Sequence, residues 1–128
     1  MIQEAYVSFE TAKLLKEKGF DENTLMVYMS YGDLCKCNRH DSIRNSNYND
    51  ITKNYFECIA PTHQMAMKWL REVHNIDICV FPYQTDYISY SYKVKIYKNK
   101  EIYLTITDSK TYEDAVEEAL KYCLENLI

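Results

Sequence analysis

The sequence predicts an α+β fold: a two-layer domain in which an antiparallel β-meander, joined by an N-terminal hairpin, is packed on one face by about three helices. Two observations support this prediction. Hydrophobic residues change from helical to alternating spacing at Asn75, and alternation over residues 87–97 is followed by a helical pattern at the C-terminus. At 128 residues the chain is long enough to bury a core, so we expect one α+β domain over residues 1–128.

Composition and charge narrow the classes of function. The net charge of −4 argues against nucleic acid as the main partner, because phosphate binding requires clustered positive charge. The start of the chain has neither the basic nor the apolar region of a signal peptide, and no apolar run approaches the ~20 residues of a membrane span. We therefore expect no membrane association and a cytoplasmic location, in the protein's own cell or in a host cell. The five cysteines are then expected to be reduced thiols.

The N-terminal third predicts a helix and a hairpin. Ser8 is a suitable N-cap for a helix that runs to about Lys18, and Gly19 ends it. Residues 25–31 have the composition of a strand, with Gly32-Asp33 as a two-residue turn before a short return strand. Residues 38–54 have no period and are rich in asparagine, so we expect a solvated loop.

A helix is predicted from Pro61, which suits the first turn because it lacks an N–H. Its apolar face is predicted to comprise Met65, Ala66, Trp69, Leu70 and Val73. The opposite, polar face is predicted to comprise His63, Gln64, Lys68, Arg71 and Glu72. Trp69 is the only tryptophan, and we expect it to be buried where this helix meets the sheet.

Three strands and a last helix follow. The strand that starts at Ile76 is followed by an alternating segment and, after a turn at Asn99-Lys100, by a third strand. The inward side chains are expected to include Ile88, Tyr90, Tyr92, Val94, Ile96, Ile102, Leu104 and Ile106. Thr111 and Asp114 form a capping box for the last helix, whose apolar residues keep helical spacing to Leu127.

Three segments of the chain are similar to one family. The phrases VSFETAKLLKEKGF at 7–20, APTHQMAMKWLREVHNI at 60–76 and TYEDAVEEALKYCLENLI at 111–128 resemble short uncharacterised proteins of gut Bacteroidales and of their phages and integrated elements. The resemblance implies a mobile-element setting and supplies neither an activity nor functional residues. The helix–three strands–helix order from Pro61 is also similar to that of double-stranded-RNA-binding domains. That family has basic residues at the start of its last helix, where this chain has Thr111-Tyr112-Glu113-Asp114.

Cysteine and histidine residues are weak candidates for chemistry. A zinc site would need four ligands from Cys35, Cys37, His40, Cys58 and His63, whose spacing fits zinc motifs poorly. A second hypothesis makes Cys58 a nucleophile with His63 as its base, but Pro61 lies between them and no amide cluster for an oxyanion follows. We expect no metal, no cofactor and no catalytic residue.

The strongest candidate for function is the side of the meander that faces away from the core. Alternation places tyrosine and lysine side chains there: Tyr87, Lys93, Lys95, Tyr97 and Tyr103, with Phe81 and Tyr83 from the neighbouring strand. Such residues anchor protein partners or stack on bases, and they are also common on half-solvated sheets. We expect a non-enzymatic binding protein that acts through contact with an unknown protein partner. The alternatives are a nucleic-acid-binding accessory protein, a cysteine-dependent enzyme, and a homodimer that buries this face.

Overall fold

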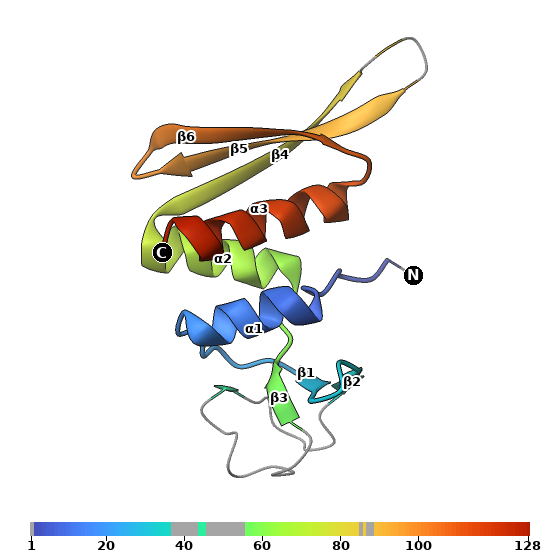
Figure 1. Ribbon diagram of the computed structural model, residues 1–128, viewed down its shortest axis with the longest axis vertical. Coiled ribbons are helices and arrows are strands. Elements are labelled where there is room, and N and C mark those ends of the chain that lie inside the picture. The colour runs from blue at the N-terminus through green and yellow to red at the C-terminus, as the bar shows by residue number, and fades with distance from the viewer. Residues whose placement is uncertain (1, 37–43, 46–55, 85, 87–88) are drawn as a thin grey trace. The chain divides into compact units, whose positions relative to one another are not determined.

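The computed structural model describes residues 2–36, 44–45, 56–84, 86 and 89–128 of the chain. It has two compact units, Met1–Thr62 and His63–Ile128, which we call the first and the second unit and describe separately (Figure 1). Each combines helix with an antiparallel three-stranded sheet, which confirms the predicted α+β class. The expectation of one domain over residues 1–128 stays a prediction.

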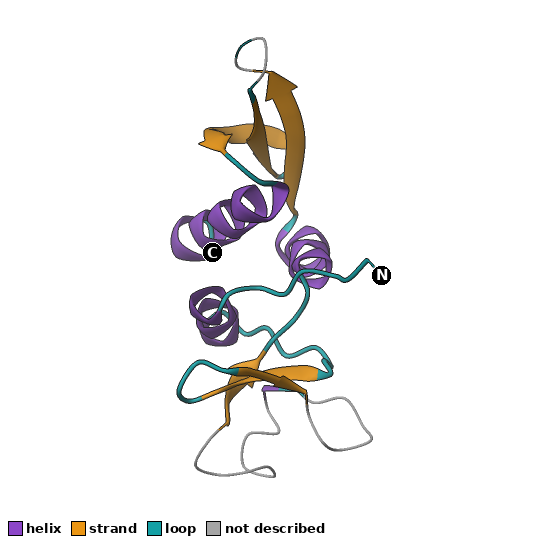
Figure 2. Ribbon diagram, turned by 90° about the vertical axis from the view of Figure 1, so that its right-hand side faces the viewer, coloured by secondary structure: helices purple, strands orange, loops and turns teal. Residues whose placement is uncertain are grey.

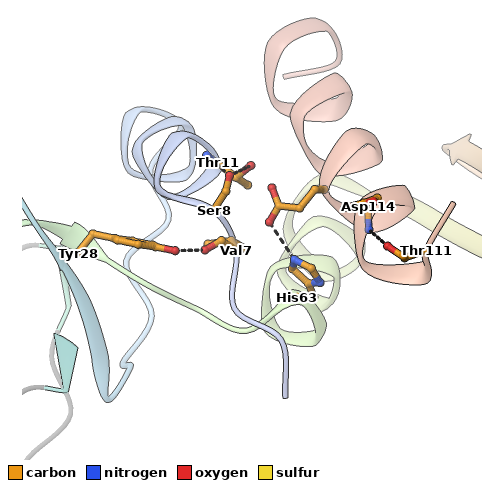
Figure 3. Close-up of polar contacts among 8 residues, drawn as sticks. Val7, Ser8, Thr11, Tyr28, His63, Thr111 and Asp114 are labelled. Carbon is orange, nitrogen blue, oxygen red and sulfur yellow. Dashed lines mark hydrogen bonds and ion pairs between the residues drawn. The ribbon is translucent and has the colours of Figure 1, made fainter. Parts of the chain in front are cut away.

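The first unit pairs one helix with a small sheet. Helix α1 (Phe9–Glu17) packs against β3 (Phe56–Ile59), and the sheet has the order β2-β1-β3, with β1 at Met26–Met29 and β2 at Leu34–Lys36. The hydroxyl of Tyr28 donates a hydrogen bond to the carbonyl of Val7, which ties β1 to the segment before the helix (Figure 3). The buried apolar side chains of this unit include Val7, Ala12, Leu15, Phe20, Val27, Cys58 and Ile59.

Helix α1 begins and ends where its sequence predicts. The Ser8 hydroxyl accepts a hydrogen bond from the Thr11 N–H at 3.2 Å, as an N-cap does. At the other end Gly19 has a φ of 93°, and the N–H groups of Gly19 and Phe20 bond to the carbonyls of Lys16 and Leu15. This pattern is a Schellman motif, in which a left-handed glycine ends the helix.

The N-terminal hairpin is present, but its loop differs from the predicted two-residue turn. The N–H of Gly32 donates to the Met29 carbonyl, and the N–H of Met29 donates to the Asp33 carbonyl. Three residues, 30–32, therefore lie between Met29 and Asp33, the pair that closes the loop. Gly32 is the third of them, with a φ of 92°, which is the glycine position of a three-residue hairpin. Strand β3 was not predicted. It is defined only by its pairing with β1, for example Val27 with Ile59, and β1 lies some thirty residues earlier in the chain.

The second unit consists of two helices on one side of the meander within its described residues (Figures 1 and 2). The order along the chain is α2 (His63–His74), β4 (Ile76–Gln84), β5 (Tyr90–Lys98), β6 (Glu101–Ser109) and α3 (Tyr112–Asn126). The sheet order β4-β5-β6 is that of a meander, and Asn99 and Lys100, both with positive φ, form its second turn. The Thr111 hydroxyl caps α3 by accepting from the Asp114 N–H at 3.0 Å (Figure 3).

The buried face of α2 is rotated relative to the sequence prediction. Trp69 is buried as expected, but Val73 is 58% exposed, and His63, assigned to the polar face, is only 4% exposed. Met67 is buried as well, so the buried arc is centred on Leu70 and on the side of the helix that holds His63. The spacing of apolar residues alone cannot locate the centre of the buried face when apolar residues lie at both of its edges.

Strand β6 corrects a second assignment. Ile102 was expected to face inward with Leu104 and Ile106, but it is 63% exposed and pairs with Tyr97. The cause is a register shift: Ile96 pairs with Leu104 and the next residue, Tyr97, pairs with Ile102, so Tyr103 is an additional residue. A β-bulge of this kind reverses the inside–outside assignment of the residues beyond it.

Membrane-crossing helices are absent from the described part of the chain: no helix there has both the length and the apolar character.

Replacing Trp69 by alanine tests the placement of α2. The indole is 7% exposed and contacts the His74 ring edge-on at 4.7 Å between centroids, so its removal leaves a large cavity. We expect W69A to lower the free energy of unfolding by about 3–5 kcal/mol in urea titrations. The matched control is Val73→Ala on the same helix, which should cost less than about 0.5 kcal/mol because Val73 is exposed. Equal losses in both variants would contradict the placement.

Candidate functional site

Strands β4 and β5 present one continuous row of side chains on the face opposite α2 and α3. Nine consecutive residue pairs join the two strands without a register shift, from Ile76 with Lys98 to Gln84 with Tyr90. Because side chains alternate, Ile76, Val94 and Ile96 share the face that the helices bury. The opposite side, called the outer face below, is formed by Asp77, Cys79, Phe81, Tyr83, Ser91, Lys93, Lys95 and Tyr97. All of these residues are at least partly exposed.

Two lysines on the outer face lie over aromatic rings. The Lys93 ammonium is 4.3 Å from the centroid of the Tyr83 ring, and the Lys95 ammonium is 5.6 Å from that of Phe81. Each ring belongs to the residue diagonally across from its lysine, since Lys93 is paired with Phe81 and Lys95 with Cys79. A cation at this distance is attracted by the negative face of the ring. We call these four side chains the lysine–aromatic ladder.

The charge of the outer face is positive, although the chain as a whole is acidic. Its one carboxylate, Asp77, is paired with the Lys100 ammonium at 3.1 Å. No carboxylate whose side chain the structure describes pairs with Lys93 or Lys95; the side chains of residues 104–108 on β6 are outside that description. Positive charges gathered on one surface attract anionic groups.

The structure brings together most of the residues that the sequence proposed for binding. Lys93, Lys95 and Tyr97 lie along β5, and Phe81 and Tyr83 lie beside them on β4. Tyr103 is exposed on β6, as the additional residue of the bulge next to Tyr97. Tyr87 lies outside the described residues. Ile102, which the sequence placed in the core, joins this surface through its pairing with Tyr97.

The zinc candidates do not form a cluster in the described residues. Cys58 is buried in the first unit beside Ile59, and His63 begins α2 in the second. Cys35 lies on the edge strand β2, and Cys37 and His40 fall outside the described residues. Across residues 2–36, 44–45, 56–84, 86 and 89–128, no three histidine, cysteine or acidic side chains are arranged to hold a metal ion.

Cys58 has the wrong environment for a nucleophile. Its side chain is fully buried, and burial raises the pKa of its thiol to about 12, although Lys16 and Lys13 oppose this. A reactive cysteine needs the opposite, a lowered pKa and access to solvent. Cys123 is buried too, and burial likewise raises its pKa to about 12.

His63 has a structural partner that the sequence did not reveal. Its Nε2 lies 2.8 Å from the Oε1 of Glu117 on α3 (Figure 3), within the second unit. The ring is buried, and its Nδ1 has no hydrogen-bond partner among the described residues. This pair joins α2 to α3, and the separation of 54 residues hides it from any pattern of local spacing.

Thiol labelling separates the buried from the exposed cysteines. With an aromatic disulfide reagent at pH 8, Cys79 on the outer face should react fast, whereas Cys58 and Cys123 should react only when the protein unfolds. Cys35 on β2 is half-exposed and should also be labelled in the folded protein. Peptide mapping after partial labelling identifies each modified residue, and a Cys79→Ser variant should lose the Cys79 share of the fast phase. Fast labelling of Cys58 in the folded protein would instead support the nucleophile hypothesis.

The two raised pKa values also predict a loss of stability at alkaline pH. The unfolded chain releases thiol protons near the ordinary pKa of 9.0, whereas folded Cys58 and Cys123 hold theirs to about 12. Their contribution to stability is therefore complete below pH 9 and is lost as pH rises towards 12. Urea titrations between pH 8 and 11 should show a smaller decline for Cys123→Ala than for the parent. An unchanged slope would contradict the burial of a protonated thiol.

Comparisons of the chain with protein-family models, with curated proteins and with solved structures find no significant match. The similarity to Bacteroidales proteins therefore stays a prediction from the sequence.

Proposed function

We propose that the chain is a non-enzymatic binding protein that acts through protein–protein contact, with the outer face as its docking surface. The observation that carries this proposal is the lysine–aromatic ladder, two ammonium groups held over aromatic rings on one face of a continuous hairpin. Tyr97, with Ile102 and Tyr103 on the adjacent strand, adds exposed apolar area next to the charges. Aromatic side chains of this kind contribute much contact area and lose little conformational freedom on binding.

The same ladder favours a protein over a single-stranded nucleic acid. Base stacking requires open ring faces, and the faces of Tyr83 and Phe81 are each approached by a lysine ammonium. The groups above these rings are ammonium groups, which pair with anions such as carboxylates and leave no flat surface there for a base. On the other side of the meander, the start of α3 carries Glu113 and Asp114, which would repel a phosphate backbone docked at that helix end.

A nucleic-acid-binding accessory protein is the second candidate. The exposed lysines and tyrosines of the outer face support it, because the combination of cations and rings also occurs in single-strand binding surfaces.

In the mobile-element setting that the sequence resemblance implies, we propose that a protein partner is a factor of the host cell.

Replacing Tyr97 and Tyr103 by serine tests the docking surface. Both side chains are partly exposed, so the double variant should unfold within about 0.5 kcal/mol of the parent. The partner is first captured from host lysate with the parent protein, identified and purified. The double variant should bind this partner at least tenfold more weakly than the parent. Titration calorimetry with the purified partner gives the affinity.

The matched control is Tyr31→Ser with Tyr90→Ser, which removes two exposed tyrosines that lie off the outer face. This control should bind like the parent. Equal losses in both double variants would contradict the assignment of the docking surface, as would unchanged binding by the first. Retention of the parent on single-stranded DNA, lost with Tyr97 and Tyr103, would favour the second candidate.

A further inference from the structure

The lysine–aromatic ladder has a period of two residues. Lys93 and Lys95 lean in the same diagonal direction. Each ammonium lies over the ring that is two residues further along β4 than the residue paired with its lysine. Tyr97 continues the row on the same face of β5. Since a strand rises about 3.4 Å per residue, the three positions follow one another at about 7 Å.

An extended polypeptide has the same period, because its alternate side chains also repeat at about 7 Å. Three alternate residues of an extended segment therefore stay in step with Lys93, Lys95 and Tyr97 over about 14 Å. A helix laid along the row presents one residue per turn of about 5.4 Å. Its three contacting residues therefore span about 11 Å, which is about 3 Å shorter than the row. The spacing thus favours a segment in β conformation.

Charge selects the side chains of that segment. No described side chain forms an ion pair with Lys93 or Lys95, and the carboxylate of Asp77 already pairs with Lys100. A second copy of the outer face carries the same positive charge, so a symmetric homodimer through this face is disfavoured. Opposite Tyr97, where Ile102 lies in the paired position of β6, the complementary side chain is apolar.

We propose that the outer face binds an extended protein segment that carries acidic residues at two alternate positions and an apolar residue at the next alternate position. The motif is acid–x–acid–x–apolar, read in either chain direction, with the acids at Lys93 and Lys95 and the apolar residue at Tyr97. This inference rests on the proposed function, and it adds the chemistry and conformation of the partner.

Selection from a random 12-residue peptide library displayed on phage tests the proposal. The target is the full chain, and binders retained equally by a Lys93→Gln, Lys95→Gln double variant are discarded. The selected peptides should be enriched in aspartate or glutamate two residues apart, with an apolar residue two further along. A synthetic peptide of this kind should bind the double variant at least tenfold more weakly than the parent, and salt should weaken its binding to the parent.

The matched control is Lys68→Gln with Lys110→Gln, which removes two exposed charges of the second unit that lie outside the outer face. It should bind the selected peptide like the parent. Acids spaced four residues apart would indicate a helical partner and overturn the proposal. Peptides without acid enrichment, or no enrichment at all, would overturn it too.

Failure of this inference is distinguishable from failure of the proposed function. If the purified natural partner still depends on Tyr97 and Tyr103 while the selected peptides lack the motif, the docking surface stands and the partner chemistry proposed here is wrong. If neither the partner nor any peptide depends on the outer face, both proposals fail.

Discussion

The continuous pairing of β4 with β5 is the constraint on which the second unit depends. Nine residue pairs without a register shift leave no freedom in the choice of inner and outer side chains along this hairpin. The same alternation that puts Val94 and Ile96 under the helices puts Lys93 and Lys95 on the other side. A slip by one residue would bury two ammonium groups, which the desolvation cost of a charge forbids. The core and the outer face are therefore specified by one set of hydrogen bonds.

The energetics of the ladder suit a surface that exchanges partners. A lysine over an exposed aromatic ring gains about 0.5–1 kcal/mol, and an exposed ion pair gains about as much. Moving the Lys93 ammonium from Tyr83 to an incoming carboxylate is thus close to neutral in free energy. For the proposed partner, net affinity would then come from burying apolar area around Tyr97 and Ile102, and the two charges would select the partner and speed its approach.

Local patterns in the sequence predicted much of the fold. Ser8, Gly19 and Thr111 bound their helices as predicted because caps depend only on neighbouring residues. Features that depend on distant residues were not predictable in this way. Strand β3 is defined by its pairing with β1, and the bulge at Tyr103 moves Ile102 to the exposed side without any local signal. The burial of His63 likewise depends on Glu117, 54 residues further along.

The candidate site was only partly predictable for the same reason. Alternation placed Lys93, Lys95 and Tyr97 on one face, but the contacts of the lysines with Tyr83 and Phe81 depend on the register between two strands. That register follows from the whole hairpin and cannot be obtained from either strand alone. The pairing also showed that Ile102 belongs with the outer face.

The proton NMR shift of the Lys93 ε-methylene group tests the ladder most directly. Because the ammonium lies 4.3 Å from the centre of the Tyr83 ring, the ring current should move this resonance upfield from its position in an unstructured peptide. The displacement for Lys95 should be smaller, since its ammonium is 5.6 Å from the Phe81 ring. A Tyr83→Leu variant should return the Lys93 resonance to the unstructured value and leave Lys95 unchanged. A Lys93 resonance at the unstructured position in the parent protein would contradict the lysine–aromatic ladder and the docking surface proposed on it.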